Sequence, residues 1–171
     1  MRFLRPIMHL LFLTLIVFVI YNFVVFPIFL VKAKIIHMID ADSLIVMDGG
    51  HIEKVQLIGV DAPEMAGLNG NIWQCYNREA KKEAAALFTP SREIALESDG
   101  ALDDKDVHGR LLRYVKMADG QYLNEELLKK GLAREYHPSG KTYEKASEFS
   151  KLETDAKAAN LGIWDVCRGA F

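Results

Sequence analysis

The sequence has few of the features that mark specialised classes of protein. Its 171 residues include only two cysteines and five prolines, with no Cys-x-x-Cys motif or histidine cluster, which excludes a dense disulfide scaffold, a collagen-like chain and a typical zinc site. The formal net charge of −2 excludes a strongly basic protein that coats nucleic acid. Half of the residues are hydrophobic and no internal repeat is present, so the chain can bury one sizeable core. Any chemistry on phosphate groups must therefore depend on a local site.

The near-neutral composition combines two chemically different parts. Residues 1–34 contain four basic side chains and no acidic one, whereas the other 137 residues contain 17 basic and 23 acidic side chains, a net charge of −6. The longest apolar run extends from Leu10 to Val31. Because about 20 helical residues cross the hydrocarbon core of a bilayer, we predict a transmembrane helix in this run. Residues 1–32 are then a membrane anchor, and residues 33–171 form the folded domain.

A cleavable secretory signal is the alternative explanation of the apolar run. Signal sequences usually have an apolar region of about 7 to 15 residues that ends at an Ala-x-Ala-like site, whereas this run is longer and continues into Val31-Lys32-Ala33-Lys34. An uncleaved anchor is therefore favoured. Two arginines and the terminal amine precede the run, and the positive-inside rule favours a cytoplasmic N-terminus with the domain outside the cytoplasm, either periplasmic or extracellular.

The two cysteines, Cys75 and Cys167, are compatible with such a compartment. In an oxidising environment they could close a loop of about 90 residues, which in the chain-entropy model stabilises a fold by roughly 4 kcal/mol. Two unrelated thiols are the alternative.

Short strand-like and helix-like segments alternate after the apolar run. Five strands are predicted, at Ala33–Ile39, Ser43–Met47, Glu53–Val60, Glu93–Glu97 and Arg110–Met117. Three helices are predicted, at Arg78–Phe88, Asn124–Lys130 and about Tyr143–Asn160. Residues 65–77 and 98–109 are predicted to be loops. Together these segments indicate an α+β, mainly β fold: a five-stranded OB-type barrel with about three helices.

Acidic side chains recur where predicted strands end. Asp40 and Asp42 are two residues apart and share one face of an extended chain, and the neighbouring strand ends at Asp61, followed by Glu64. Carboxylates held together require a cation, and hard oxygen ligands suit calcium or magnesium. Ordinary turn chemistry is the alternative role of such aspartates.

A second cluster is His108-Gly109-Arg110, at the start of a predicted strand. An arginine placed by a glycine turn can bind a phosphate through two parallel N–H donors of its planar guanidinium. An ordinary salt bridge at a strand edge is the alternative.

Seven short blocks occur in an order that is specific to one family. They are Ile39-Asp40-Ala41-Asp42-Ser43, the segment from Val55 to Glu64, the segment from Cys75 to Ala80, Asp106-Val107-His108-Gly109-Arg110, Leu123-Asn124, Gly131-Leu132-Ala133 and Leu161-Gly162-Ile163-Trp164. With these blocks, residues 33 to 165 resemble the staphylococcal nuclease (thermonuclease) family. The resemblance implies an OB-type barrel with three helices, and a calcium-dependent enzyme that hydrolyses phosphodiester bonds in DNA and RNA.

The resemblance also implies roles for the acidic residues. Asp42 and Asp61 match the carboxylates that bind calcium. Ala62 stands where a threonine supplies mainly its backbone carbonyl, and Asp40 lies just outside the ligands. Glu64 matches the carboxylate that orients or deprotonates the attacking water.

Of the two arginines that clamp the phosphate in the family, Arg110 matches one, but Gln56 stands in place of the other. A neutral amide supplies neither the charge nor the fork of a guanidinium, so reduced activity is expected. Lys54 lies on the same strand face as Gln56 and is a candidate to compensate in part, as is Arg113.

Two further residues are candidates for contact with the substrate. His108 stands where the family often has an aromatic residue beside the nucleotide, and Tyr136 is a candidate for base or sugar contact; a solvated loop residue and a packing residue are the respective alternatives. The leading hypothesis is therefore a membrane-anchored, calcium-dependent nuclease acting on nucleic acid. The alternatives are a non-catalytic, nuclease-like binding module and a structural part of an envelope complex.

Overall fold

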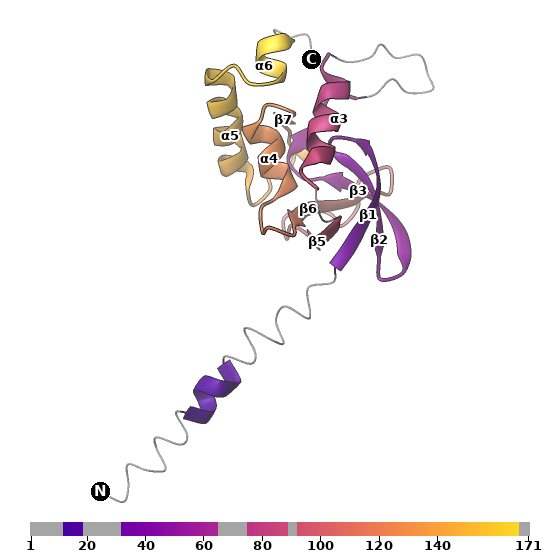
Figure 1. The fold of residues 1–171 in the computed structure, drawn as a ribbon, viewed down its shortest axis with the longest axis vertical. Coiled ribbons are helices and arrows are strands. Elements are labelled where there is room, and N and C mark those ends of the chain that lie inside the picture. Colours follow the sequence, from indigo (N-terminus) through magenta and orange to yellow (C-terminus); the bar gives the residue numbers. More distant parts are fainter. Residues whose placement is uncertain (1–11, 19–31, 65–74, 89–91, 168–171) are drawn as a thin grey trace, which may run out of the picture. The chain divides into compact units, whose positions relative to one another are not determined.

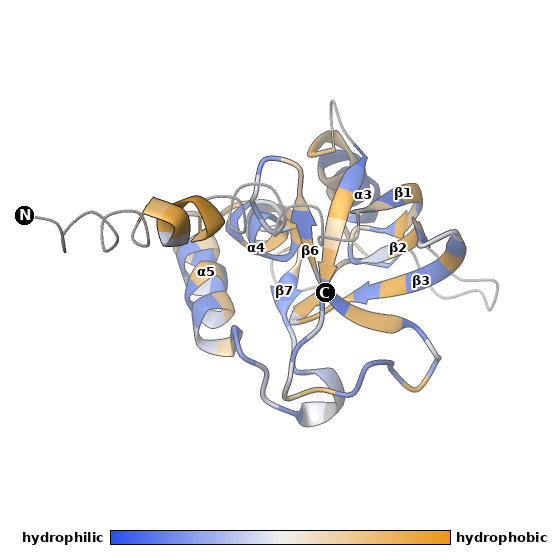
Figure 2. Cartoon of the chain, turned by 90° about the horizontal axis from the view of Figure 1, so that it is seen from below, coloured by the Kyte–Doolittle hydropathy of each residue, from blue (hydrophilic) through white to orange (hydrophobic). Residues whose placement is uncertain are grey.

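The computed structural model describes residues 12–18, 32–64, 75–88 and 92–167. The chain divides into two units, Met1–Val31 and Lys32–Phe171. In the first, residues 12–18 form a helix with exposed side chains, mostly hydrophobic in Figure 2. Most of the predicted membrane-spanning run lies outside the described residues. Within the described part of the chain, no helix is long and apolar enough to cross a bilayer.

The second unit is built on a closed barrel of five strands (Figure 1). The strands are β1 (Lys32–Asp40), β2 (Ser43–Asp48), β3 (His51–Leu57), β5 (Glu93–Glu97) and β6 (Leu111–Met117). Their order around the barrel is β1-β2-β3-β6-β5, and all neighbours are antiparallel except the parallel pair β3 and β6. The prediction of a mainly β, five-stranded barrel is confirmed.

The predicted continuous strand from Glu53 to Val60 is wrong. The chain turns at Gly59, where φ is +75° and an added Cβ would lie 2.6 Å from the ring of Tyr143, so only glycine fits. The following short strand β4 (Val60–Asp61) leaves the barrel and pairs with β7 (Arg134–Glu135). Asp61 is therefore presented by a small second sheet and not by the barrel.

In the described part of this unit, three main helices accompany the barrel, as predicted. They are α3 (Asn77–Ala86), α4 (Leu123–Lys129) and α5 (Ala146–Ala158), followed by the short α6 (Ile163–Val166). A 3₁₀ turn, η2 (Pro138–Gly140), and strand β7 were not predicted. Helix α5 begins three residues later than expected because Tyr143 is part of the core, where its hydroxyl donates to Glu135 Oε1 over 2.6 Å.

Asn124 ties helix α4 to the barrel. Its side chain is fully buried, with Oδ1 accepting from the backbone N–H of Val115 (2.9 Å) and Nδ2 donating to the carbonyl of Ile58 (2.8 Å). Buried backbone groups need such partners. Asn124 therefore fixes the chain where β3 ends and the turn toward Asp61 begins.

Cys75 and Cys167 form a disulfide that joins residues 92 positions apart. Replacing both by serine is expected to lower the free energy of unfolding by about 4 kcal/mol, because the unfolded chain regains the entropy that the closed loop removed. Chemical denaturation of the oxidised proteins measures this difference. Wild-type protein treated with a reductant should match the double variant, and an unchanged unfolding midpoint would contradict the expectation.

Candidate active site

A cavity of about 440 Å³ opens at the end of the barrel where β1 ends and β2 begins. Its walls come from this β1–β2 turn, β3, β4, the loop before β6 and the segment after β7. The polar residues that line it are Asp40, Asp42, Ser43, Gln56, Asp61, Glu64, Asp103, Lys105, Asp106, His108, Arg110, Tyr136 and Lys141. We refer to this cavity as the acidic cleft.

Asp42 is the most deeply buried carboxylate of the cleft, with 6% of its surface exposed. The backbone N–H of Ala62 donates to its Oδ2 over 2.9 Å, and Ser43 Oγ lies 3.2 Å from its Oδ1. Burial raises the pKa of Asp42 to about 6, helped by the charges of Asp61 and Asp40 and opposed by hydrogen bonds. The fold therefore holds a carboxylate in a place that disfavours its negative charge.

The raised pKa predicts how the metal-free protein responds to pH. Between pH 4 and 6 the folded state keeps the Asp42 proton and the unfolded state loses it, so Asp42 lowers stability by about 1 kcal/mol per unit as pH rises through this range. Denaturation in the presence of a chelator, for wild type and Asp42→Asn, isolates this contribution. Relative to wild type, the variant should gain stability as the pH rises from 4 to 6; parallel curves would contradict the prediction.

Asp61 is paired with Arg134, a residue that sequence reasoning missed. Both Nε and Nη2 of Arg134 contact Asp61 Oδ2, at 2.8 and 2.6 Å. The contact follows from the pairing of β4 with β7, in which Asp61 lies directly opposite Arg134. Neither two-residue strand has a sequence pattern long enough to predict this pairing.

Asp42 and Asp61 are the two carboxylates of the cleft that would hold a calcium ion, if one binds. Asp42 and Asp61 repel each other electrostatically, and a cation would relieve both this repulsion and the burial cost of Asp42. Across the described ranges, however, no group of three or more Asp, Glu, His or Cys side chains has a metal-binding arrangement. Backbone carbonyls, with Ala62 as the predicted one, and water would have to complete the shell, and Asp40 supplies negative charge nearby.

Arg110 is held at the mouth of the cleft by Asp106. Its Nε donates to Asp106 Oδ2 over 2.6 Å, and its Nη1 donates to Ser43 Oγ over 3.3 Å. Burial acts to raise the pKa of Asp106, but the hydrogen bonds and charge of Arg110 hold it below its usual range. The glycine turn at Gly109, where φ is +77°, brings the backbone N–H of Arg110 onto the same carboxylate. The guanidinium is thus oriented before any substrate binds.

Ser43 connects Arg110 and Gln56, the two positions that the resemblance assigns to the phosphate clamp. In addition to its contact with Arg110, its hydroxyl donates to Gln56 Oε1 over 2.8 Å. Gln56 lies directly opposite Ser43 in the ladder between β2 and β3 and lines the cleft. Position 56 therefore faces the same space as Arg110, as the resemblance implied, and Ser43 is a site residue that sequence reasoning missed.

Glu64 lines the cleft from the chain segment after β4 and is exposed to solvent. Its carbonyl accepts a hydrogen bond from Asn77 Nδ2 over 3.3 Å. Asn77 is buried at the first turn of α3, two residues from the disulfide at Cys75. The helix therefore anchors the backbone at Glu64.

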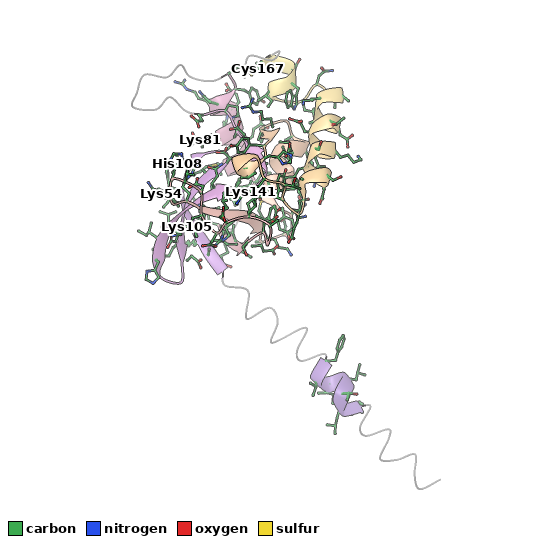
Figure 3. All side chains as sticks on the ribbon, turned by 180° about the vertical axis from the view of Figure 1, so that it is seen from behind. Lys54, Lys81, Lys105, His108, Lys141 and Cys167 are labelled. Carbon is green, nitrogen blue, oxygen red and sulfur yellow. A yellow bond between two sulfur atoms is a disulfide. The ribbon has the colours of Figure 1, made fainter. Side chains whose placement is uncertain are left out.

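Of the residues predicted to contact the substrate, the structure places two in the cleft and one outside it. His108 and Tyr136 line the cleft, together with Lys105 and Lys141, which sequence reasoning did not select. Figure 3 labels His108 and the two lysines. Lys54 does not line it. Although Lys54 lies on the same face of β3 as Gln56, it is two residues farther from the cleft end and is exposed on the outside of the barrel.

Arg113 does not compensate for Gln56 either. Its Nη2 lies 2.7 Å from Asp104 Oδ1, and its Nη1 donates to the carbonyl of Leu112 over 2.8 Å. The residue is outside the cleft lining. Neither Lys54 nor Arg113 therefore supplies the positive charge that Gln56 lacks.

The structure is a closed five-stranded barrel of OB type with an acidic cleft at one end, and comparison with known proteins identifies its family. The family model described as "Staphylococcal nuclease homologue" matches residues 54–166. A thermonuclease of Staphylococcus intermedius is 36% identical over 129 residues, which cover 75% of this chain and 73% of the relative. The chain belongs to the staphylococcal nuclease family.

Two Bacillus subtilis proteins are similar to the same part of the chain. The SPbeta prophage-derived endonuclease YokF and endonuclease YncB are each 36% identical over 138 residues, or 79% of this chain. These residues make up 44% of YokF and 62% of YncB. The chain thus spans about half the length of these two relatives.

Proposed function

We propose that this protein is a calcium-dependent nuclease that hydrolyses phosphodiester bonds in DNA or RNA, at a rate reduced by Gln56. The observation that carries the proposal is that the predicted site residues line one cleft. It combines a buried carboxylate of raised pKa at Asp42, a second carboxylate at Asp61, an exposed Glu64 and the preoriented guanidinium of Arg110. Family membership and the names of the relatives, thermonuclease and endonuclease, support it.

The chemistry of the cleft suits attack of water on a phosphodiester. A calcium ion held by Asp42 and Asp61 would supply positive charge against the charge that develops on the phosphate oxygens. Arg110 donates hydrogen bonds to the same oxygens, already positioned by Asp106 and Ser43. Glu64 orients the attacking water and accepts its proton as the new P–O bond forms. The P–O bond to one sugar breaks in the same step, and the departing sugar oxygen takes a proton from solvent.

The charge of the domain limits how it binds nucleic acid. With a net charge of −6 over residues 35–171, the surface contributes little of the salt-dependent, sequence-independent affinity that basic proteins have. Among the residues that the structure describes, the cations that line the cleft are Lys105, Arg110 and Lys141. Binding therefore depends on the cleft itself, and we expect weak affinity for substrate.

We also propose that residues 10–31 tether the enzyme to a membrane, with the domain outside the cytoplasm. The length and composition of this run support the tether. The disulfide between Cys75 and Cys167 supports an oxidising compartment, since such bonds persist mainly outside the cytosol.

A non-catalytic binding module is the second candidate function. The observation that favours it is Gln56, which leaves one clamp position uncharged in an acidic cleft. Such a module would bind nucleic acid without cleaving it.

A hydrolysis assay separates the two functions. The full chain, in detergent, is incubated with single-stranded DNA or RNA in the presence of calcium and, separately, of a chelator. Cleavage that requires calcium is the expected result. Binding of the oligonucleotide without cleavage under either condition would favour the binding module, and cleavage that the chelator leaves unchanged would exclude the calcium mechanism.

A further inference from the structure

The first turn of helix α3 carries a buried polar side chain that takes no part in the chemistry proposed above. Asn77, the first residue of α3, is 4% exposed, and its Nδ2 donates to the backbone carbonyl of Glu64 over 3.3 Å. Glu64 is exposed and lies in irregular chain three residues after β4. The hydrogen bond from Asn77 therefore ties the backbone that carries the proposed general base to a helix of the core.

Two hydrogen bonds hold the chain between β4 and Glu64. The backbone N–H of Ala62 donates to Asp42 Oδ2 over 2.9 Å, and the carbonyl of Glu64 accepts from Asn77. Pro63, between them, has a φ that is fixed by its ring. The first bond holds this segment to the proposed metal site, and the second sets where Glu64 lies beside it. Placement matters for catalysis, because a displacement of about 1 Å can lower a rate about 10²-fold.

The start of α3 has a strained backbone and no side-chain cap. Tyr76, the N-cap residue, has a φ of +68°, a left-handed conformation that residues other than glycine rarely adopt, and no side chain caps the helix. Such a conformation persists only where the surrounding structure holds it. The disulfide at Cys75, the residue directly before Tyr76, supplies a covalent restraint at this point.

The other end of the disulfide lies in a closely packed part of the fold. Cys167 follows the last residue of α6 and is 5% exposed. The backbone N–H of Ile163, the first residue of α6, donates to the carbonyl of Gly131 over 2.9 Å. A Cβ added to Gly162 would collide with the same carbonyl, so the two chain segments are in direct backbone contact. The disulfide therefore ties the first turn of α3 to an anchored helix (Figure 1).

We propose that Asn77 positions Glu64 for catalysis and that the disulfide keeps Asn77 in place, so that hydrolysis is fast only in the oxidised protein. Asn77 is a positioning residue, since it touches the backbone of Glu64 and not the substrate. The inference rests on the proposed nuclease function. A nuclease with this property is less active in a reducing compartment, where cysteines remain thiols.

Reduction releases the start of α3 without removing the helix. A dithiol transfers two electrons and two protons to the disulfide, which becomes two thiols, while the dithiol becomes a cyclic disulfide. Tyr76 then leaves its left-handed conformation, the first turn unwinds, and Asn77 withdraws from the carbonyl of Glu64. The rest of α3 stays in place because Ala80 and Ala84 are buried in the core.

The rate effect of Asn77→Ala in two backgrounds tests the positioning role. The substitution is made in the full chain and in Glu64→Gln, and kcat for cleavage of single-stranded DNA at saturating calcium is divided by the folded fraction from circular dichroism. We expect kcat to fall about 10-fold in the wild-type background and to change less than about 2-fold in Glu64→Gln, which has already lost the group that Asn77 positions. Calcium affinity should not change.

Glu83→Ala is the matched control. Glu83 Oε1 accepts a hydrogen bond from the Tyr76 hydroxyl over 3.0 Å on the same helix, but the residue does not line the cleft. Its removal should leave kcat unchanged. If Asn77→Ala does not fold, Asn77→Asp takes its place, because an ionised carboxylate keeps the volume of the amide but cannot donate to a carbonyl.

Treatment with dithiothreitol tests the part of the disulfide. We expect reduction to lower kcat several-fold in folded wild type and to leave kcat of Asn77→Ala almost unchanged, because the bond to Glu64 is already absent. A loss of equal size in both proteins, or no loss in wild type, refutes the link between the disulfide and Asn77.

The remaining outcomes separate this inference from the nuclease function. Wild type without calcium-dependent hydrolysis refutes the function itself, and the positioning role with it. Wild-type hydrolysis with an unchanged kcat in Asn77→Ala refutes the positioning role alone. An equal loss of kcat in the wild-type and Glu64→Gln backgrounds also refutes it, because Asn77 then acts on the fold as a whole and not through Glu64.

Discussion

Replacing Arg110 by alanine is expected to lower calcium-dependent hydrolysis by about 10²–10³-fold, the usual cost of losing one donor to the transition state. Arg110 is the arginine of the described cleft lining, and Asp106 and Ser43 fix its guanidinium in advance. Arg110→Lys should recover little of the rate, because an ammonium group cannot reproduce the planar fork. Initial rates at saturating calcium measure both effects.

Arg113→Ala is the matched control. Arg113 lies on β6, three residues after Arg110, which precedes that strand, and its guanidinium is engaged by Asp104 outside the cleft. Its removal should leave the rate within a few-fold of wild type. An equal loss of rate in Arg110→Ala and Arg113→Ala would mean that Arg110 contributes to the stability of the fold and does not contact the substrate.

Replacing Gln56 by arginine is expected to raise the rate by about 10²-fold, because the arginine would add one charged hydrogen-bond donor to the transition state. Gln56 faces the cleft, shares Ser43 with Arg110 and lies close to the buried Asp42. A guanidinium here would add a second clamp for the phosphate. It would also favour the ionised form of Asp42.

Gln121→Arg adds the same charge at an exposed position after β6 and should leave the rate unchanged. Calcium binding by calorimetry accompanies the rate measurements. If Gln56→Arg binds calcium and nucleic acid but still does not cleave the nucleic acid, the cleft is a binding site and not a catalytic centre of reduced activity.

The barrel was predictable because each of its strands carries a local signal. β-branched runs and the turn at Asp48-Gly49-Gly50 place β1, β2 and β3, and the helices follow from residues of high helix propensity. The break at Gly59 was missed because Val55 to Val60 reads as one apolar strand. What ends the strand is contact with Tyr143, 84 residues later in the sequence.

The site residues could be predicted only where they belong to the sequence blocks that resemble the family. Asp42, Glu64 and Arg110 line one cleft, although the sequence alone offered equally good structural explanations for each. Arg134 and Ser43 were missed because their roles arise from pairing between strands. Lys54 was only a candidate on the ground of its strand face, and it does not line the cleft because a shared strand face does not fix distance along the strand.

The most direct test of the account compares wild type with Glu64→Gln in calcium-dependent hydrolysis. Glu79→Gln, at an exposed glutamate on α3 outside the cleft, is the matched control. We predict that Glu64→Gln lowers the rate by about 10²–10⁴-fold, the range for loss of a general base, whereas Glu79→Gln retains the wild-type rate. Hydrolysis by Glu64→Gln at the wild-type rate would contradict the assignment of the acidic cleft as a nuclease centre.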